Sequence, residues 1–231
     1  MASIIDSIKN VSGDSHPYFK ITVLSVLLFI TLQFNQQKML EPTVLLCFNF
    51  AMVFFFLGYF AQTIYNTLNE KPVILPDFLN PIKTIWIGFL GSLAVLPTAF
   101  LVYWAMTSLY KMLAFNLYVN IIIMLIVFFA LFTFTAIQLL FFARNYKLTQ
   151  AYNLPLFLTT AGDIIAYSSL LSVFVILFST VILWPIGYAV FMMFGKGFVL
   201  DYYMVSATLY VILVVLQYYA QLYFEFVDLG S

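Results

Sequence analysis

Between Ile85 and Ala143 the sequence carries a single charged residue, Lys111. A helix crosses the roughly 30 Å hydrocarbon core of a bilayer with about 20 apolar residues, so this run is far too long for one crossing. We therefore expect the chain to turn near Lys111 and to cross twice. Because the backbone finds no water to bond in lipid, each crossing is expected to be an α-helix.

The rest of the chain has the same character. Of its 231 residues, 65% are hydrophobic and only 8% are charged, whereas a soluble globular domain has about 25% charged residues. Such a chain cannot cover a water-exposed surface, so membrane lipid must be part of its solvent. The formal net charge is zero, which excludes nucleic-acid binding driven by a large basic field.

The sequence predicts an all-α integral membrane protein, a single polytopic membrane domain over 1–231 built as a helical bundle of about six transmembrane helices. The predicted spans, bounded by charged and polar residues, are 18–37, 44–61, 85–110, 117–143, 164–191 and 202–224. Pro97 and Pro185 lie inside the third and fifth spans and are expected to kink them. The first apolar run is short, so the first two segments either both span or form a re-entrant hairpin.

A short N-terminal amphipathic helix is expected before the first span. Ser3 can cap this helix, with Asp6 three residues later in a variant of the capping box. The apolar residues that then fall on one helical face are Ile4, Ile5, Ile8 and Val11. Such a helix should lie in the membrane interface; a frayed terminus is the alternative. The first 20 residues do not resemble a cleaved signal peptide.

The basic residues are distributed unevenly between the two sides of a six-span chain. The N-terminal side holds Lys9, Lys20, Lys71, Lys83, Arg144 and Lys147, and the other side holds Lys38, Lys111 and Lys196. Lys and Arg are enriched in cytoplasmic loops. We therefore expect the N- and C-termini to be cytoplasmic, with the chain integral to the cell (inner) membrane.

The longest moderately polar stretch, residues 58–81, joins the second and third spans. Gly58 and Tyr59 are expected to end the second span, residues 64–68 to lie along the interface, and Leu75 and Pro76 to turn the chain into the third span. The pattern LPxFL near its end recurs at 154–158. We predict a docking elbow on the cytoplasmic side, made of Gly58, Tyr59, Leu75, Pro76, Asp77, Phe78, Leu154, Pro155 and Phe157.

These motifs follow one another in a particular order. A Gly-Tyr pair is followed by the polar segment QTIYNTLNE, then by LPxF, and then by a glycine within a new span, in WIGF at 86–89. From residue 20 to 224 the chain resembles an uncharacterised family of polytopic prokaryotic membrane proteins, domain of unknown function 4013. KLTQAYNLPLFLTTAGDIIAY resembles that family's second elbow, and the last aromatic-Ala-Gln-x-Tyr its final helix. That family usually has an acidic residue just after Leu-Pro and an aromatic residue. This chain departs from the pattern, because its acidic residue there is limited to Asp77. The resemblance implies the architecture and a prokaryotic membrane, and it implies no activity.

Polar residues inside the spans are few. No charged residue lies near the middle of any predicted span. The uncharged polar residues there are Asn49, Asn120, Gln138 and Gln217. Each needs a hydrogen-bond partner in lipid. We predict contacts between helices, with a substrate path lined by these residues as the alternative.

Little in the sequence indicates catalysis. His16 is the only histidine, and Cys47, the only cysteine, lies in apolar surroundings where a thiol stays protonated. The turn at 195–197 is too short for a phosphate-binding loop. Asp163 is expected to cap the fifth span, with a polar cavity beside it as the alternative. We predict no catalytic residue, no cofactor and no metal site.

The sequence therefore favours a non-catalytic accessory or structural subunit of a membrane complex. Its predicted partners are membrane lipid and other membrane protein subunits or a second copy of the chain. The alternative is a carrier or pore for a neutral or amphipathic solute. A carrier requires Asn49, Asn120 and Gln138 to converge on one cavity, whereas a subunit requires them in separate helix contacts.

Overall fold

The computed structural model describes residues 3–37, 40–112, 120, 134–153, 155, 159–160, 162, 164, 167, 171, 174–175 and 178–228. All regular structure within these ranges is helical, without a strand. Four of the described helices are long and apolar enough to cross a membrane, namely Pro17–Gln37, Pro42–Leu68, Pro81–Leu109 and Phe198–Phe226. These observations confirm an all-α fold of membrane-spanning composition.

The first three helices begin at residues suited to a helix start. α1 (Ile4–Ser12) is capped by Ser3, whose Oγ accepts a hydrogen bond from Asp6 N–H at 3.4 Å. α2 (Pro17–Gln37) and α3 (Pro42–Leu68) both begin with proline, which lacks the N–H that a first turn leaves unpaired. The position of α1 in the membrane interface remains a prediction.

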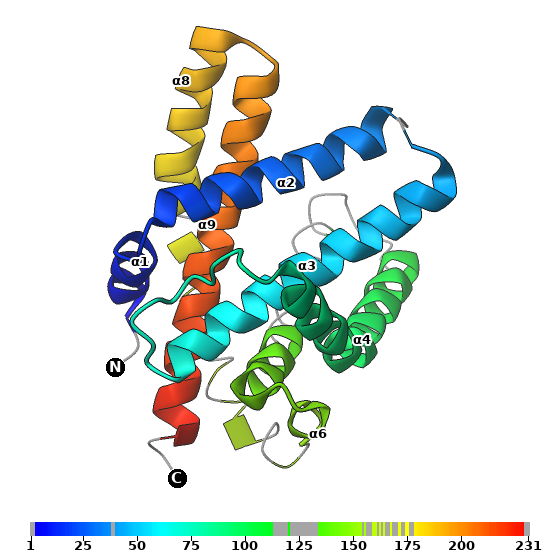
Figure 1. Ribbon diagram of the computed structural model, residues 1–231, viewed down its shortest axis with the longest axis vertical. Helices are drawn as coiled ribbons and strands as arrows, with labels where there is room; N and C mark the ends of the chain where they lie inside the picture. The colour runs from blue at the N-terminus through cyan, green and yellow to red at the C-terminus, as the bar shows by residue number, and fades with distance from the viewer. Residues whose placement is uncertain are drawn as a thin grey trace.

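α2 and α3 follow each other in the chain with residues 38–41 between them. Figure 1 shows the two helices as arms of a hairpin that both pass across α9 (Phe198–Tyr223). With 21 residues, α2 extends for about 31 Å at 1.5 Å per residue, which matches the hydrocarbon core. The length of α2 is therefore compatible with a full crossing as well as with a re-entrant hairpin.

α4 (Pro81–Met112) is a continuous helix of 32 residues that contains Pro97. Asn80 caps it, since its Oδ1 accepts a hydrogen bond from Lys83 N–H at 3.2 Å. Figure 1 shows α4 as a bent ribbon. Proline removes a backbone hydrogen bond and clashes with the preceding turn, so the expected kink has a clear cause.

α3 and α4 cross at two facing glycines. A Cβ added to Gly58 would lie 1.8 Å from the backbone oxygen of Thr84, and one added to Gly88 would lie 1.6 Å from that of Phe54. Gly58 and Tyr59 do not end the helix, because α3 continues to Leu68 without a break; that they end the second membrane span stays a prediction. Gly58 interrupts the side-chain surface of the helix so that α4 can approach.

The described elements of the C-terminal half include one long helix, α9, and several short ones. The short elements are α6 (Leu148–Ala151), the π-helical turn η1 (Ser179–Leu183), α8 (Trp184–Phe194) and a second π-helical turn η2 (Phe224–Asp228). Pro185 lies in the first turn of α8, directly after η1, and π-turns commonly mark such irregular points. Gly195, with φ of 71°, ends α8 and confirms the predicted turn before α9.

Two of the six predicted spans are described only in part. The structure describes the predicted span 117–143 only at Asn120 and from residue 134 onward, and the predicted span 164–191 continuously only from residue 178. The count of six spans therefore remains a prediction.

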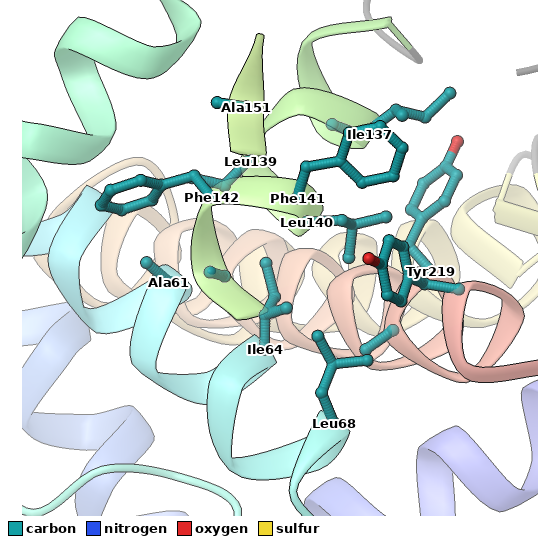
Figure 2. Close-up of a cluster of buried hydrophobic side chains, with 14 of the residues drawn as sticks. Ala61, Ile64, Leu68, Ile137, Leu139, Leu140, Phe141, Phe142, Ala151 and Tyr219 are labelled. Atoms are coloured by element: carbon teal, nitrogen blue, oxygen red, sulfur yellow. The ribbon is translucent and has the colours of Figure 1, made fainter. Parts of the chain in front are cut away.

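The buried side chains form two clusters. The larger cluster, part of which is shown in Figure 2, joins α3 at Ala61, Ile64 and Leu68 to the helical residues 136–143 and to the end of α9. The smaller cluster joins α1, α2, α3 and α9, and it includes Leu75 from the segment between α3 and α4. Both clusters are built on α3 and α9, which therefore form the centre of the described fold.

Candidate functional site

The segment that joins α3 to α4, residues 69–80, folds into the protein at Leu75 and Pro76. Both residues are buried, and Leu75 has no exposed surface. The ring of Phe78 stacks on that of Tyr59 at a centroid distance of 5.7 Å. The middle of the segment is therefore packed against protein rather than lying on the membrane surface.

Charged side chains hold this turn in place. The Lys20 ammonium donates a hydrogen bond to the Leu75 carbonyl at 2.6 Å, and it lies 3.3 Å from Asp14 Oδ1 and 3.1 Å from Asp77 Oδ1. Asp14 Oδ2 accepts a hydrogen bond from Leu75 N–H. The Asp14 side chain is fully buried and that of Lys20 is 4% exposed. We call Asp14, Lys20, Leu75 and Asp77 the elbow clamp.

The elbow clamp satisfies the conditions under which buried charge is tolerated. Removing two charges from water costs several kcal/mol per ion, unless good geometry and further hydrogen bonds compensate. Asp14 uses both carboxylate oxygens, and Lys20 has two carboxylates and a backbone carbonyl within reach. The clamp thereby ties the start of α2 to a turn 55 residues later in the chain. Its groups are occupied with one another, which fits a structural role.

The hydroxyl of Tyr59 is a polar group inside this region that the clamp does not use. The side chain is 1% exposed, and no described residue forms a hydrogen bond with the hydroxyl. The aromatic ring supplies packing against Phe78 and the smaller core. Tyr59 is therefore placed here by its ring, at the cost of an unpaired hydroxyl.

These positions correct the predicted docking elbow. Gly58, Tyr59, Leu75 and Pro76 are buried, so a partner cannot touch them without unfolding the segment. The Asp77 side chain is 57% exposed but ion-paired, Phe78 is half-buried, and Pro155 is exposed. Leu154 and Phe157 lie outside the described residues, as does Asp163. The exposed apolar side chains at this end are instead Leu79, Ile82 and Trp86.

The predicted intramembrane polar residues form separate pairs. Asn49 on α3 exchanges two hydrogen bonds of 2.8 Å with Asn35 on α2. Gln138 accepts a hydrogen bond of 2.5 Å from Thr98 on α4. Each of these pairs joins a different set of neighbouring segments. Asn49 and Gln138 therefore do not converge on one cavity.

The remaining two predicted polar residues differ in what the structure describes of them. Gln217 on α9 accepts a hydrogen bond of 2.5 Å from Thr67 on α3, which is a third contact between helices. Asn120 is half-buried. Among the four predicted residues, Gln217 also lines a cavity.

That cavity lies where α3 and α9 end near the chain termini, and its volume is about 510 Å³. Its walls come from α1, the end of α3, residues 70–74, α9 and η2. Among its lining residues are Asp6, Asn10, Thr67, Glu70, Lys71, Gln217, Gln221 and Glu225. We call it the terminal cavity. It is the described cavity in which charged side chains from three elements meet.

Aromatic stacking fixes the wall beside this cavity. Lys71 Nζ lies over the Tyr65 ring, 4.5 Å from its centroid, and the Tyr146 ring stacks on the Tyr65 ring at a centroid distance of 4.8 Å. Burial raises the pKa of the Tyr146 hydroxyl well above its ordinary value, so this ring stays neutral at physiological pH. Lys71 is therefore engaged with an aromatic face.

The described residues form no candidate metal site. In the part of the chain that the structure describes, no three His, Cys, Asp or Glu side chains come close enough together to hold a metal ion. His16 and Cys47 are both exposed. The absence of catalytic residues and cofactors remains a prediction.

Sequence reasoning missed Asp14, Lys20 and the terminal cavity. Lys20 looks like an ordinary charge at the start of a span, and nothing near it indicates burial. The repeated Tyr-x-Ala-Gln motif carried a partial signal, since Gln221 accepts a hydrogen bond from Ser3 N–H at 3.1 Å and lines the cavity. In the first copy, Gln62 instead donates to Thr84 at 2.9 Å.

Comparisons with protein-family models, with curated proteins and with solved structures found no match to this chain. The family resemblance of the motifs therefore remains a prediction. The structure gives two of those motifs a physical link, because the glycines of Gly58-Tyr59 and of WIGF face each other where α3 crosses α4.

Proposed function

We propose that this chain is a non-catalytic integral membrane protein that serves as an accessory or structural subunit of a membrane complex. In this proposal the bundle has about six spans in a prokaryotic cell membrane, with α1 in the interface and both termini cytoplasmic. The observation that carries the proposal is the pairing of the polar side chains. Asn49 and Gln138 are each bonded to a neighbouring segment, and neither contributes to a shared polar path.

The outward faces of the apolar helices support the same role. Large apolar and aromatic side chains are exposed along the second half of α4 and along α8. Examples are Phe100, Leu101, Tyr103, Trp104, Trp184, Tyr188, Met192 and Met193. Such faces require lipid or other membrane helices to cover them, because they exceed what a water-exposed surface tolerates.

The alternative of a carrier or pore for a neutral or amphipathic solute has weaker support. A carrier needs polar groups from several helices around one substrate site near the middle of the membrane. The described pairs of Asn49 and Gln138 leave little polar capacity for such a site. The terminal cavity lies at helix ends rather than at their centres.

Purification under mild conditions tests the proposal. The full chain should be extracted with a gentle detergent or directly into lipid nanodiscs, and its mass should be measured by light scattering and native mass spectrometry. A defined oligomer, or a stoichiometric membrane protein that co-purifies, is expected. A strictly monomeric and partner-free chain would overturn the proposal. In parallel, flux of neutral solutes into liposomes above the level of empty liposomes would favour the carrier.

A further inference from the structure

The terminal cavity has the size of a small-molecule site. Its volume of about 510 Å³ lies within the range of about 300–1,000 Å³ that is typical of ligand pockets. It is bounded by the last turns of two apolar helices, since the candidate spans end at Leu68 and Phe226. A ligand here would therefore lie at the level where a membrane meets water.

The floor of the cavity presents an amide group that is only half used. Gln217 is 1% exposed, and one end of its amide bonds to Thr67 at 2.5 Å. No described residue bonds to the other end, although the side chain lines the cavity. The unpaired end is the Nε2 group, a hydrogen-bond donor, and it is therefore a ready contact for an oxygen atom of a polar ligand.

The charged groups around the cavity are mostly acidic. Three carboxylates, from Asp6, Glu70 and Glu225, meet a single cation, Lys71. Asp6 shares an exposed ion pair with Lys9 at 3.8 Å, and Lys71 is held over the Tyr65 ring. The carboxylates are too widely spread to hold a metal ion together. The field of this cavity therefore favours a larger organic cation.

Glu70 adopts a backbone conformation that is unfavourable for a residue with a side chain. Its φ of 49° lies in the left-handed region, where glycine is the usual residue after a helix end. The hydrogen bonds Glu70 N–H to Thr67 O and Lys71 N–H to Asn66 O close the helix in this conformation. A residue with a side chain is disfavoured in this conformation relative to glycine. The carboxylate has no ion-pair partner among the described residues.

We propose that the terminal cavity binds an organic ammonium group that carries an oxygen a few bonds away, with the Glu70 carboxylate as the charge partner of the ammonium group and the Gln217 Nε2 group donating a hydrogen bond to that oxygen. The ammonium group can belong to a free amine such as ethanolamine or to the headgroup of phosphatidylethanolamine. This inference does not rest on the proposed function, because either a subunit or a carrier could hold such a ligand.

The test uses the full chain in an amine-free buffer. Binding of free ethanolamine is measured by calorimetry on protein in a neutral detergent. Binding of the lipid is measured by native mass spectrometry on protein from phosphatidylcholine nanodiscs, with and without phosphatidylethanolamine. Saturable binding of either one supports the site, and comparison of the two arms identifies the source of the ammonium group. Absence of saturable binding in both arms overturns the proposal.

Glu70→Gly separates loss of binding from loss of folding. This variant relieves the left-handed conformation, so its thermal midpoint without ligand should rise, whereas its affinity for the bound amine should fall by about tenfold, as expected for losing one charge-assisted hydrogen bond. Glu41→Gln, which removes an exposed carboxylate before α3 that does not line the cavity, is the matched control and should bind normally. Unchanged affinity in Glu70→Gly would refute the assignment.

Discussion

The two halves of the segment between α3 and α4 differ in whether their polar groups have partners within the protein. At Leu75 the backbone N–H and C=O are both bonded to buried charged side chains, and the carboxylates of Asp14 and Asp77 are paired with Lys20. A few residues earlier, Glu70 holds a strained backbone and a carboxylate without an ion-pair partner among the described residues. The first arrangement stabilises the fold. The second leaves groups available to a ligand.

This contrast shows that burial of charge and function need not coincide. The Asp14 side chain is fully buried, and both of its carboxylate oxygens are used by neighbours. Asp6 and Glu70, two of the carboxylates that line the terminal cavity, are exposed. A site is therefore better recognised by polar groups that lack partners than by burial alone.

The largest effect on stability is expected from breaking the elbow clamp. Lys20→Met leaves the Asp14 carboxylate buried without its cation, so the free energy of unfolding should fall by about 3–5 kcal/mol. Urea or thermal unfolding in detergent micelles measures this. Lys9→Met, which removes an exposed ion pair, is the control and should change stability by less than about 1 kcal/mol. Equal effects of the two substitutions would show that the clamp is not buried.

A second large effect on stability is expected where α3 crosses α4. Gly58→Ala places a methyl group 1.8 Å from the Thr84 backbone oxygen, and backbone cannot move aside as a side chain can. The helices must separate, at a cost of about 3 kcal/mol. Gly162→Ala is a matched control, because nothing lies within 4 Å of an added Cβ there. A thermal midpoint unchanged by Gly58→Ala would contradict the close crossing.

A substitution at Glu70, in the other half of the segment, should change the free energy of unfolding in the opposite direction. Glu70→Gly should raise the free energy of unfolding by about 1 kcal/mol, because glycine adopts the left-handed conformation without a steric penalty. The same unfolding assay measures the change. A loss of stability would mean that the Glu70 side chain contributes to the fold, and the contrast between the two halves would fail.

The smallest effect is expected at the outer member of the clamp. The Asp77 side chain is 57% exposed, so water screens its ion pair with Lys20. Asp77→Asn should therefore lower the free energy of unfolding by less than about 1 kcal/mol. If this substitution destabilised the protein as much as Lys20→Met, Asp77 rather than Asp14 would be the main partner of Lys20.

Local sequence signals predicted local structure well. The cap at Ser3 and the turn at Gly195 each depend on residues within a few positions, and each is present. The same dependence on neighbouring residues led to the wrong interpretation of Gly58 as a helix end. Its partner Gly88 is distant in sequence, and a glycine that ends a helix looks the same locally as one that admits another helix.

The site depended on contacts that no local pattern contains. Gln217 meets Thr67 across 150 residues, and Asp14 meets Leu75 across 61. Span prediction rests on hydropathy and treats charges as boundaries, so it placed Lys20 at the edge of a span and could not assign it a partner. The membrane class of the fold was predictable from composition, whereas the distinction between the clamp and the cavity required the three-dimensional arrangement.

The contacts between the first and last helices also set an order of assembly. Every residue of the elbow clamp lies within the first 80, so the clamp can close early while the ribosome is still extending the chain. Ser12, by contrast, bonds to Tyr210 at 2.9 Å, and Ser3 bonds to Gln221. These bonds, and the terminal cavity with them, can form only when α9 has been synthesised. The proposed ligand site thus requires the chain through α9, whereas the elbow clamp requires only residues within the first 80.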